Sequence, residues 1–312
     1  MKSALVNTLF AIVAIIALPL HAARAAEALP VTELAPGNFV HYGVHEDRSA
    51  ANLGDNANIG FIIGERCVLV VDTGGSYAIG SALREAIRKV SDKPVCYVVI
   101  THVHPDHFFG AAAFVADKPE FIGHENFPRQ LAGRARPYLN SLQRDLGDLA
   151  QGSEPIQVTR TIATGETLSL DLGGRMVDIK AWVPAHTDDD LTVFDRRTRT
   201  LWLADLLFID HTPVLDSNIT GFLDVMAQLR NIDAAHYVAG HGRSALPWPQ
   251  PFDAQEHYFR VILVETRAAI KRGDSLMEAV NTIGLSEEPN WVNFDGFHRR
   301  NVTTAWTELE WE

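Results

Sequence analysis

The amino-acid sequence predicts an α/β fold, and two patterns lead to that conclusion. Residues 95–100 are apolar and rich in β-branched side chains, which is typical of a buried strand, and residues 106–115 begin like a helix with an acidic first turn. Residues 77–90 carry apolar side chains every three or four positions with charged residues between them. That spacing predicts an amphipathic helix that covers the face of a sheet.

Further strands and helices are expected on both sides of this unit. Two apolar runs flank a short turn within residues 59–72, which predicts a hairpin. The second half is dominated by short strands and the final third by helices. The expected strands are 121–124, 167–172, 176–182, 191–194 and 200–204, and the expected helices are 125–149 (one or two, interrupted at Pro137), 257–272, 276–283 and 297–312.

The segment between the strand at 95–100 and the following helix carries the most informative chemistry. It contains His102, His104, Asp106 and His107, so three imidazoles and one carboxylate fall within six residues. Imidazole nitrogen and carboxylate oxygen bind zinc at about 2.0–2.2 Å. These side chains lie where a strand ends and a helix begins, which is the edge of an α/β sheet where ligands bind.

One loop cannot enclose a metal ion, so further ligands are expected downstream. Three segments place a metal-type residue beside an apolar strand, and they supply His186, Asp205 and His241. Asp205 taken alone is also explained as the cap of the turn that follows a strand end. Because six other candidate ligands accompany Asp205, a ligand role is the favoured interpretation.

The order and context of these residues resemble the metallo-β-lactamase superfamily of dinuclear metallohydrolases. The first segment matches its Thr-His-x-His-x-Asp-His-x-x-Gly pattern at every specified position, and the resemblance extends from Asp72 to His241. It implies a four-layer αββα sandwich, two Zn²⁺ ions per chain, and a supporting role for Asp72 outside the ligand set, which competes with a plain turn or helix-cap role. It also implies His102, His104 and His186 at one zinc, Asp106, His107 and His241 at the other, and Asp205 between them.

The chain departs from the family pattern after His186. The family commonly has Pro-Gly-His-Thr followed by Gly and one polar residue, whereas this chain has Pro-Ala-His-Thr followed by Asp188, Asp189 and Asp190. Asp190 is a candidate support for His186, and an exposed acidic turn is the alternative. The neighbourhood of Asp205 looks more like glyoxalase II and other hydrolases with a bridging carboxylate than like zinc β-lactamases.

The resemblance implies a hydrolase that cleaves an ester, thioester, lactone or β-lactam with a hydroxide held between the metals and oriented by Asp106. The C-terminal helices and an export signal look like the exported subgroup associated with quinoprotein and sulfur-oxidation systems. Two alternatives remain open: a mononuclear iron sulfur dioxygenase on the same fold, and a non-catalytic accessory protein of a periplasmic redox system, with a quinoprotein as partner. Metal content separates two zinc ions from one iron.

Substrate-contact candidates are few, because pocket loops follow no readable pattern. They are Arg136 and Tyr138 in one helix and Arg299 and Arg300 in the last, and a solvated surface role competes for each. His124 lies outside every motif and is expected to be a structural imidazole.

The N-terminus resembles a secretory signal peptide over residues 1–25. Lys2 precedes an apolar run at 9–18 that is too short to span a bilayer, and Ala23-Arg24-Ala25 supplies a cleavage site. We therefore expect one exported, periplasmic domain of residues 26–312 without stable membrane insertion after cleavage. An uncleaved anchor is the alternative.

Charge and cysteine content narrow the functional classes further. The 312 residues include 39 acidic and 27 basic side chains, for a formal net charge of −12. This surface disfavours nucleic acids and anionic membranes as partners, and a small-molecule substrate is expected. Cys67 and Cys96 lie near the starts of two predicted strands. A disulfide and two buried thiols are both compatible with that placement.

Overall fold

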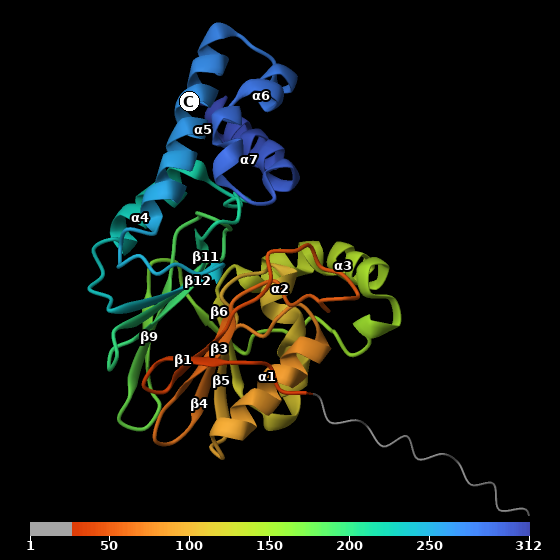
Figure 1. Ribbon diagram of the computed structural model, residues 1–312, viewed down its shortest axis with the longest axis vertical. Helices are drawn as coiled ribbons and strands as arrows, with labels where there is room; N and C mark the ends of the chain where they lie inside the picture. The colour runs from red at the N-terminus through yellow and green to blue at the C-terminus, as the bar shows by residue number, and fades with distance from the viewer. Residues whose placement is uncertain (1–26) are drawn as a thin grey trace, which may run out of the picture.

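The computed structural model describes residues 27–312, so the predicted signal peptide lies outside the described residues. Within that range two sheets lie face to face, with helices on both outer surfaces (Figure 1). The first sheet, in the order β1 to β7, contains β1 Thr32–Ala35, β2 Asn38–His41, β3 Ile59–Ile63, β4 Val68–Val71, β5 Val95–Val99, β6 Glu120–His124 and β7 Arg160–Ile162. The second, in the order β12-β11-β10-β9-β8, contains β8 Thr167–Asp171, β9 Met176–Ala181, β10 Leu191–Asp195, β11 Thr200–Phe208 and β12 His236–His241.

The helices complete a four-layer αββα arrangement, which confirms the predicted fold class. Helix α1 Tyr77–Val90 and helix α3 Phe127–Leu146 lie on the side of the first sheet, and α4 Ile219–Leu229 lies on the side of the second (Figure 1). The remaining helices are α2 Pro105–Phe108, α5 Phe252–Arg272, α6 Leu276–Thr282 and α7 Phe294–Leu309, with 3₁₀ segments η1 Phe109–Asp117, η2 Gly147–Ala150 and η3 Leu285–Asn290. Within residues 27–312, none of these helices combines the length and apolarity needed to cross a bilayer.

The buried apolar side chains form separate layers that match this architecture. One cluster joins the first sheet to its helices, with Phe61, Leu83 and Phe114 fully buried. A second fills the space between the sheets, where Leu69 and Val177 belong to opposite layers. A third joins the second sheet to the C-terminal helices. The strands between two apolar layers therefore have few exposed side chains, which explains their continuous apolar sequences.

Strand direction places the site at one end of the sheets. Strand β4 pairs in parallel with β5, and β11 pairs in parallel with β12. The carboxyl ends of parallel neighbours meet at one edge. Asp72 follows β4, the segment from His102 follows β5, and His241 ends β12.

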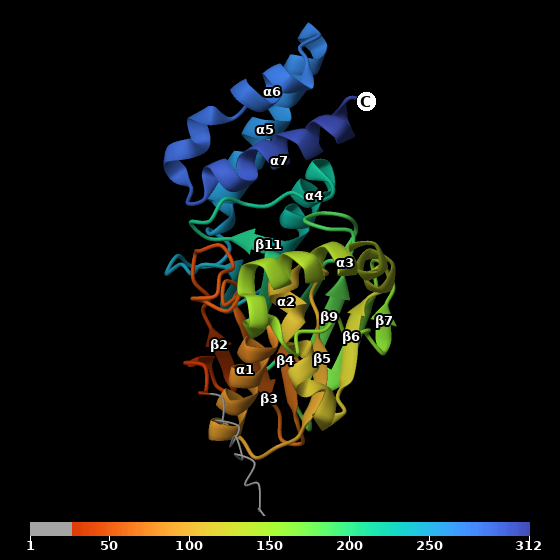
Figure 2. The same ribbon diagram turned by 90° about the vertical axis from the view of Figure 1, so that its right-hand side faces the viewer.

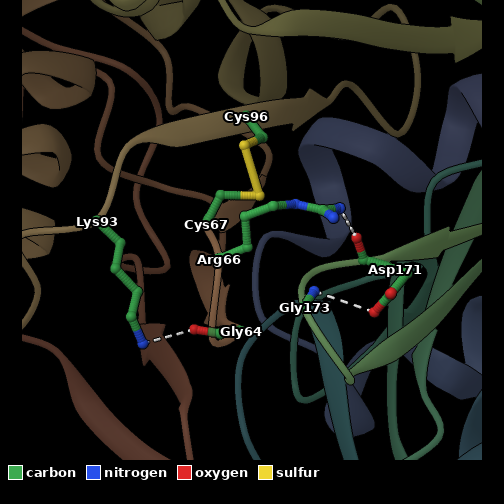
Figure 3. The surroundings of a disulfide bond; sticks show 7 residues. All are labelled: Gly64, Arg66, Cys67, Lys93, Cys96, Asp171 and Gly173. Atoms are coloured by element: carbon green, nitrogen blue, oxygen red, sulfur yellow. Dashed lines mark hydrogen bonds between the residues drawn. A yellow bond between two sulfur atoms is a disulfide. The ribbon is translucent and has the colours of Figure 1, made fainter.

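The opposite ends of β4 and β5 are joined by a disulfide between Cys67 and Cys96, whose Cα atoms lie 5.8 Å apart (Figure 3). This outcome decides between the two alternatives that the sequence allowed. Beside it, Lys93 Nζ donates a hydrogen bond of 2.7 Å to the carbonyl oxygen of Gly64 (Figure 3). The two strands that deliver Asp72 and His102 are thus cross-linked at their ends far from the site.

Three predicted elements differ from the structure. The helix expected over 106–115 is only the four-residue α2, and the chain continues as the 3₁₀ segment η1. Pro137 does not interrupt the helical region, because α3 runs through it from Phe127 to Leu146. Strand β11 does not end at Ala204 but continues to Phe208, so the prediction that Asp205 lies at a strand end is wrong.

Candidate metal centre

The structure brings together all seven side chains that the sequence singled out. Their ligand atoms form two groups, each with its atoms within 4.8 Å of one another. The first group contains His102, His104, His186 and Asp205, and the second contains Asp106, His107 and His241. They come from the β5–α2 segment, the β9–β10 loop, the interior of β11 and the end of β12.

The carboxylate of Asp205 lies between the two groups. Its Oδ2 atom is 3.3 Å from Nε2 of His186 and 3.6 Å from Nε2 of His102. Its Oδ1 atom is 3.1 Å from Nε2 of His107 and 3.4 Å from Nε2 of His241. Each oxygen therefore faces a different group of imidazoles, which is the arrangement expected of a carboxylate shared by two cations.

A local irregularity of β11 aims Asp205 at this position. The register between β11 and β12 shifts between Trp202 and Ala204, and Ala204 has a φ of 46°. A left-handed residue within a strand bends the chain and redirects the side chain that follows. Since an alanine rarely adopts this conformation, the strain is concentrated beside the functional side chain.

Two glycines are required by close approaches around the ligands. A Cβ atom on Gly240 would lie 2.0 Å from Oδ1 of Asp205, so only glycine leaves room for the carboxylate there. A Cβ atom on Gly110, the last position of the first motif, would lie 1.9 Å from the carbonyl oxygen of Thr73. Both glycines therefore keep backbone segments close enough for the ligands to converge.

The unpaired atoms at the centre fit bound cations. Among the described residues, Nε2 of His102, Nε2 of His107 and Oδ1 of Asp205 are buried and have no hydrogen-bond partner. A buried polar atom without a partner costs about 1–3 kcal/mol, and native structures contain few of them. A metal ion in each group would satisfy these three atoms together, and histidine and carboxylate are ligands that zinc accepts.

Electrostatics support the same interpretation. Burial, with His107 nearby, holds the pKa of His102 well below its ordinary value, and burial lowers the pKa of His186 to about 4. Both rings are therefore neutral at pH 7, with a lone pair available for a cation. Although burial opposes ionisation of Asp205, the surrounding imidazoles hold the pKa of this carboxyl well below its usual range. The first group thus combines neutral nitrogen donors with a buried anion. In the second group burial opposes charging of the rings, but Asp205 and the nearby carboxylates raise the pKa of His107 and of His241 above the ordinary value.

Asp72 supports His107 from outside the ligand set, as the resemblance implied. Its Oδ2 atom accepts a hydrogen bond of 2.8 Å from Nδ1 of His107, which directs Nε2 of that ring toward the centre. Thr101 fixes the carboxylate in turn, because its backbone N–H and its hydroxyl donate bonds of 2.8 Å and 2.7 Å to Asp72. Such outer carboxylates set the tautomer and orientation of ligating histidines.

The support predicted for His186 is different from the one observed. Nδ1 of His186 donates to the carbonyl oxygen of Val214 at 2.8 Å. Asp190 makes no hydrogen bond to this ring; it accepts bonds from the backbone N–H and the hydroxyl of Thr187, at 2.9 Å and 2.6 Å. The prediction that Asp190 supports His186 directly is therefore wrong, because the carboxylate stabilises the neighbouring turn instead.

A cavity of about 670 Å³ opens over the centre. Asp106, His104, Asp205 and His241 are among the residues that line it. The rest of the lining comes from the loop 46–48, from α3, from the segment after β11 and from the beginning of α7, and it includes Glu46, Asp47, Arg48, Tyr138, Arg144, Asp145, His211, Gly296, Phe297 and Arg300. Tyr138 and Arg300, two of the predicted contact residues, line this cavity, whereas Arg136 and Arg299 do not.

Two further residues near the centre, His124 and Asp216, differ in whether the sequence predicts their role. His124 belongs to neither ligand group; it contacts the carbonyl oxygen of Trp182 at 3.1 Å and the backbone N–H of Asn126 at 3.0 Å, as expected of a structural imidazole. Asp216 was missed, although its Oδ2 atom is 3.2 Å from Nε2 of His104. It lies in a loop without a motif, so only the three-dimensional structure could reveal its contact.

Comparison with known proteins places these observations in a family. The family model described as "Metallo-beta-lactamase superfamily" matches residues 53–241, a span that contains all seven side chains. The chain belongs to this superfamily. Its members are mostly hydrolases, and the two groups of side chains found here could hold their metal ions.

Individual relatives are more distant. The chain is 27% identical over 183 residues to the alpha subunit of a 2,4-dinitroanisole O-demethylase from Nocardioides sp., covering 58% of this chain and 51% of that protein. It is 43% identical over 51 residues to a linear primary-alkylsulfatase from Pseudomonas sp., covering 16% of this chain and 10% of that one. The chain thus spans about half of the length of the first relative and about a tenth of the length of the second.

Among solved structures, the sec-alkylsulfatase Pisa1 from Pseudomonas sp. is similar with a TM-score of 0.68 at 15% identity. That match covers 89% of this chain and 50% of the alkylsulfatase. At this identity the similarity establishes the fold alone.

Proposed function

We propose that this protein is a dinuclear zinc hydrolase acting on a small carboxylic derivative: an ester, a thioester, a lactone or a β-lactam. The observation that carries the proposal is the position of Asp205, whose two oxygens face two separate groups of imidazoles. A single metal ion would not require Asp106, His107 and His241 to converge as a second group. The mononuclear iron dioxygenase is therefore the weaker alternative.

Zinc ions in the two groups would supply an activated water and an electrophile for the substrate oxygen. The residues of the chain determine where this chemistry occurs. Asp106 lines the cavity, and its Oδ2 atom is 3.5 Å from Nε2 of His241. From this position Asp106 orients the attacking water and accepts its proton at a carboxylate oxygen.

The cavity walls would select the substrate. Phe297 and Tyr138 offer aromatic surface, and Arg300 offers a cation beside the metal ligands. A substrate with an apolar portion and a carbonyl group fits this combination. The names of the relatives add sulfate esters and aryl methyl ethers to the compounds worth testing.

Metal analysis combined with a substrate screen tests the proposal. We expect about two zinc ions per chain by mass spectrometry, and turnover of at least one member of a panel of esters, thioesters, lactones, β-lactams, sulfate esters and aryl methyl ethers. The variant His104→Ala, prepared in parallel, supplies the blank. One iron and no zinc would support the dioxygenase instead, and two zinc ions without any turnover would support the accessory protein.

We also propose export to the periplasm, which rests on the sequence of residues 1–25 alone. Intact-mass measurement of the protein from cells should give a chain that begins near Ala26. A full-length chain would contradict cleavage.

A further inference from the structure

The orientation of His104 differs from that of the other ligand imidazoles. Its Nδ1 atom faces the first group and lies 2.9 Å from Nε2 of His186. His102, His107, His186 and His241 instead present Nε2 to Asp205. The Nε2 atom of His104 therefore points outward, and it meets Oδ2 of Asp216 at 3.2 Å.

Asp216 is itself held from two sides. Its backbone N–H donates a hydrogen bond of 2.9 Å to the carbonyl oxygen of His186, so the loop of Asp216 is attached to the segment of another ligand. Its Oδ2 atom also accepts a bond of 2.6 Å from Nη1 of Arg134, a residue of α3. The carboxylate thus lies between a ligand imidazole and a guanidinium, and it is only about one-fifth exposed.

We propose that Asp216 is a positioning residue for the first metal group, and that Arg134 holds Asp216 in the orientation that His104 requires. The inference rests on the proposed function, because it concerns ligands of the same site. An imidazole that binds a cation through Nδ1 must carry its proton on Nε2, and a carboxylate that accepts this proton in a hydrogen bond fixes both the tautomer and the ring plane. Asp216 lies where that acceptor is needed.

This arrangement links helix α3 to the metal centre. Figure 2 shows α3 beside α2, the short helix that begins directly after His104. On α3, the hydroxyl of Tyr138 is 3.4 Å from Nη1 of Arg134, and Tyr138 lines the cavity. The same helix therefore supplies a wall of the cavity and the guanidinium that anchors Asp216. A change in Arg134 should reach the first metal group although Arg134 contacts none of its ligands.

The test compares Asp216→Ala, Asp216→Asn and Arg134→Met with the unsubstituted protein. Outer carboxylates of this kind are worth on the order of 10- to 100-fold in metal affinity. In a chelator competition, we expect Asp216→Ala to weaken the binding of the first metal ion by that factor, while the second ion stays bound. Asp216→Asn keeps an acceptor oxygen without the charge, so it should lose less metal affinity than Asp216→Ala. Arg134→Met should reduce the affinity for the first metal ion by a smaller factor still. The double variant Asp216→Ala/Arg134→Met should lose no more affinity than Asp216→Ala alone.

Spectroscopy gives a readout that does not depend on activity. In the cobalt-substituted protein, Asp216→Ala should change the visible absorption of the first ion, because its imidazole ligand is no longer oriented. Asp178→Asn is the matched control, since Asp178 is similarly exposed and bonded to an arginine, Arg196, but contacts no ligand. That variant should match the unsubstituted protein in every measurement.

The outcomes separate this inference from the proposed function. If the unsubstituted protein binds two metal ions and Asp216→Ala binds them with unchanged affinity and an unchanged cobalt spectrum, the positioning role is wrong and the hydrolase proposal stands. If the unsubstituted protein binds no metal, the proposed function itself fails. Equal weakening of both ions would show that Asp216 supports the fold of the whole centre rather than His104.

Discussion

The two ligand groups receive their outer support from different parts of the molecule. His107 is bonded to Asp72, which is 1% exposed, follows a central strand and accepts two further bonds from Thr101. His104 is bonded to Asp216, which lies in a loop at the cavity and depends on the surface helix α3. One support is therefore part of the core, and the other lies in the loop that follows Val214, a residue of the cavity lining. The difference indicates that the orientation of His107 is fixed by the core, whereas the orientation of His104 depends on a loop and on a surface helix.

The largest effect is expected where the two groups meet. Asp205→Asn keeps the shape of the side chain but removes the charge that faces four imidazoles. We expect the catalytic efficiency, kcat/KM, to fall by more than about 100-fold, beyond the loss typical of outer carboxylates. Bound zinc should fall below two ions per chain. Full metal content with normal turnover in this variant would remove the basis for a shared carboxylate, and circular dichroism of the apoprotein verifies that the variant is folded.

Removal of one ligand should affect the two groups unequally. In His104→Ala the first group loses a nitrogen donor that is partly exposed, while the second group keeps all its members. We expect the metal content to drop from two ions to one with little change in the free energy of unfolding of the apoprotein. Mass spectrometry of the metal content measures this directly. An unchanged content of two ions would contradict the assignment of His104 as a ligand.

Because Asp72 is buried in the core and Asp216 is partly exposed, their removal should lower the free energy of unfolding by different amounts. Asp72→Ala leaves the N–H and hydroxyl of Thr101 and the Nδ1–H of His107 without their acceptor, and each such buried donor costs roughly 1–3 kcal/mol. Asp216→Ala removes partly exposed contacts, which are worth under about 1 kcal/mol. Urea unfolding of the two apoproteins should therefore show a larger loss for Asp72→Ala. Equal losses would mean that the two supports do not differ as described.

The sequence predicted which candidate ligands converge more completely than it predicted the residues that support them, for a physical reason. His102, His104, Asp106 and His107 are consecutive enough to form a pattern, and a strand and a turn determine how they lie. His186, Asp205 and His241 are isolated, but each accompanies an apolar run that predicts a strand. Asp216 has neither signal, because its role depends on a loop packing against a helix that is 82 positions away along the chain.

The sequence predicts the regular elements of the backbone but not its local irregularities. The hairpin at β3 and β4 and helix α1 were predicted correctly, because their apolar spacing is regular. The continuation of β11 past Asp205 was not, because it depends on a left-handed Ala204 that propensity disfavours. The walls of the cavity include the beginning of α7, whose return to the site depends on tertiary packing rather than on any local pattern.

The last prediction concerns the turn that carries His186, whose buried carboxyls make the stability of the apoprotein depend on pH. Thr187 Oγ1 lies 2.9 Å from Oδ1 of Asp189 and 2.6 Å from Oδ1 of Asp190, and among the described residues Oδ2 of Asp189 has no hydrogen-bond partner. Burial raises the pKa of Asp189 to about 6 and holds the pKa of Asp190 well above its usual range. The folded protein therefore prefers these carboxyls protonated.

The sign of the effect follows from this preference. The unfolded chain releases the proton of an aspartate near pH 4, while the folded chain keeps that of Asp189 to about pH 6. Between these values the folded state binds more protons, so the free energy of unfolding of the apoprotein should fall as the pH rises, by up to about 3 kcal/mol. Asp189→Asn should lack this part of the slope. We expect urea unfolding of the two apoproteins at pH 4 to 7 to diverge across that window, and parallel curves would show that Asp189 is ionised in the folded protein.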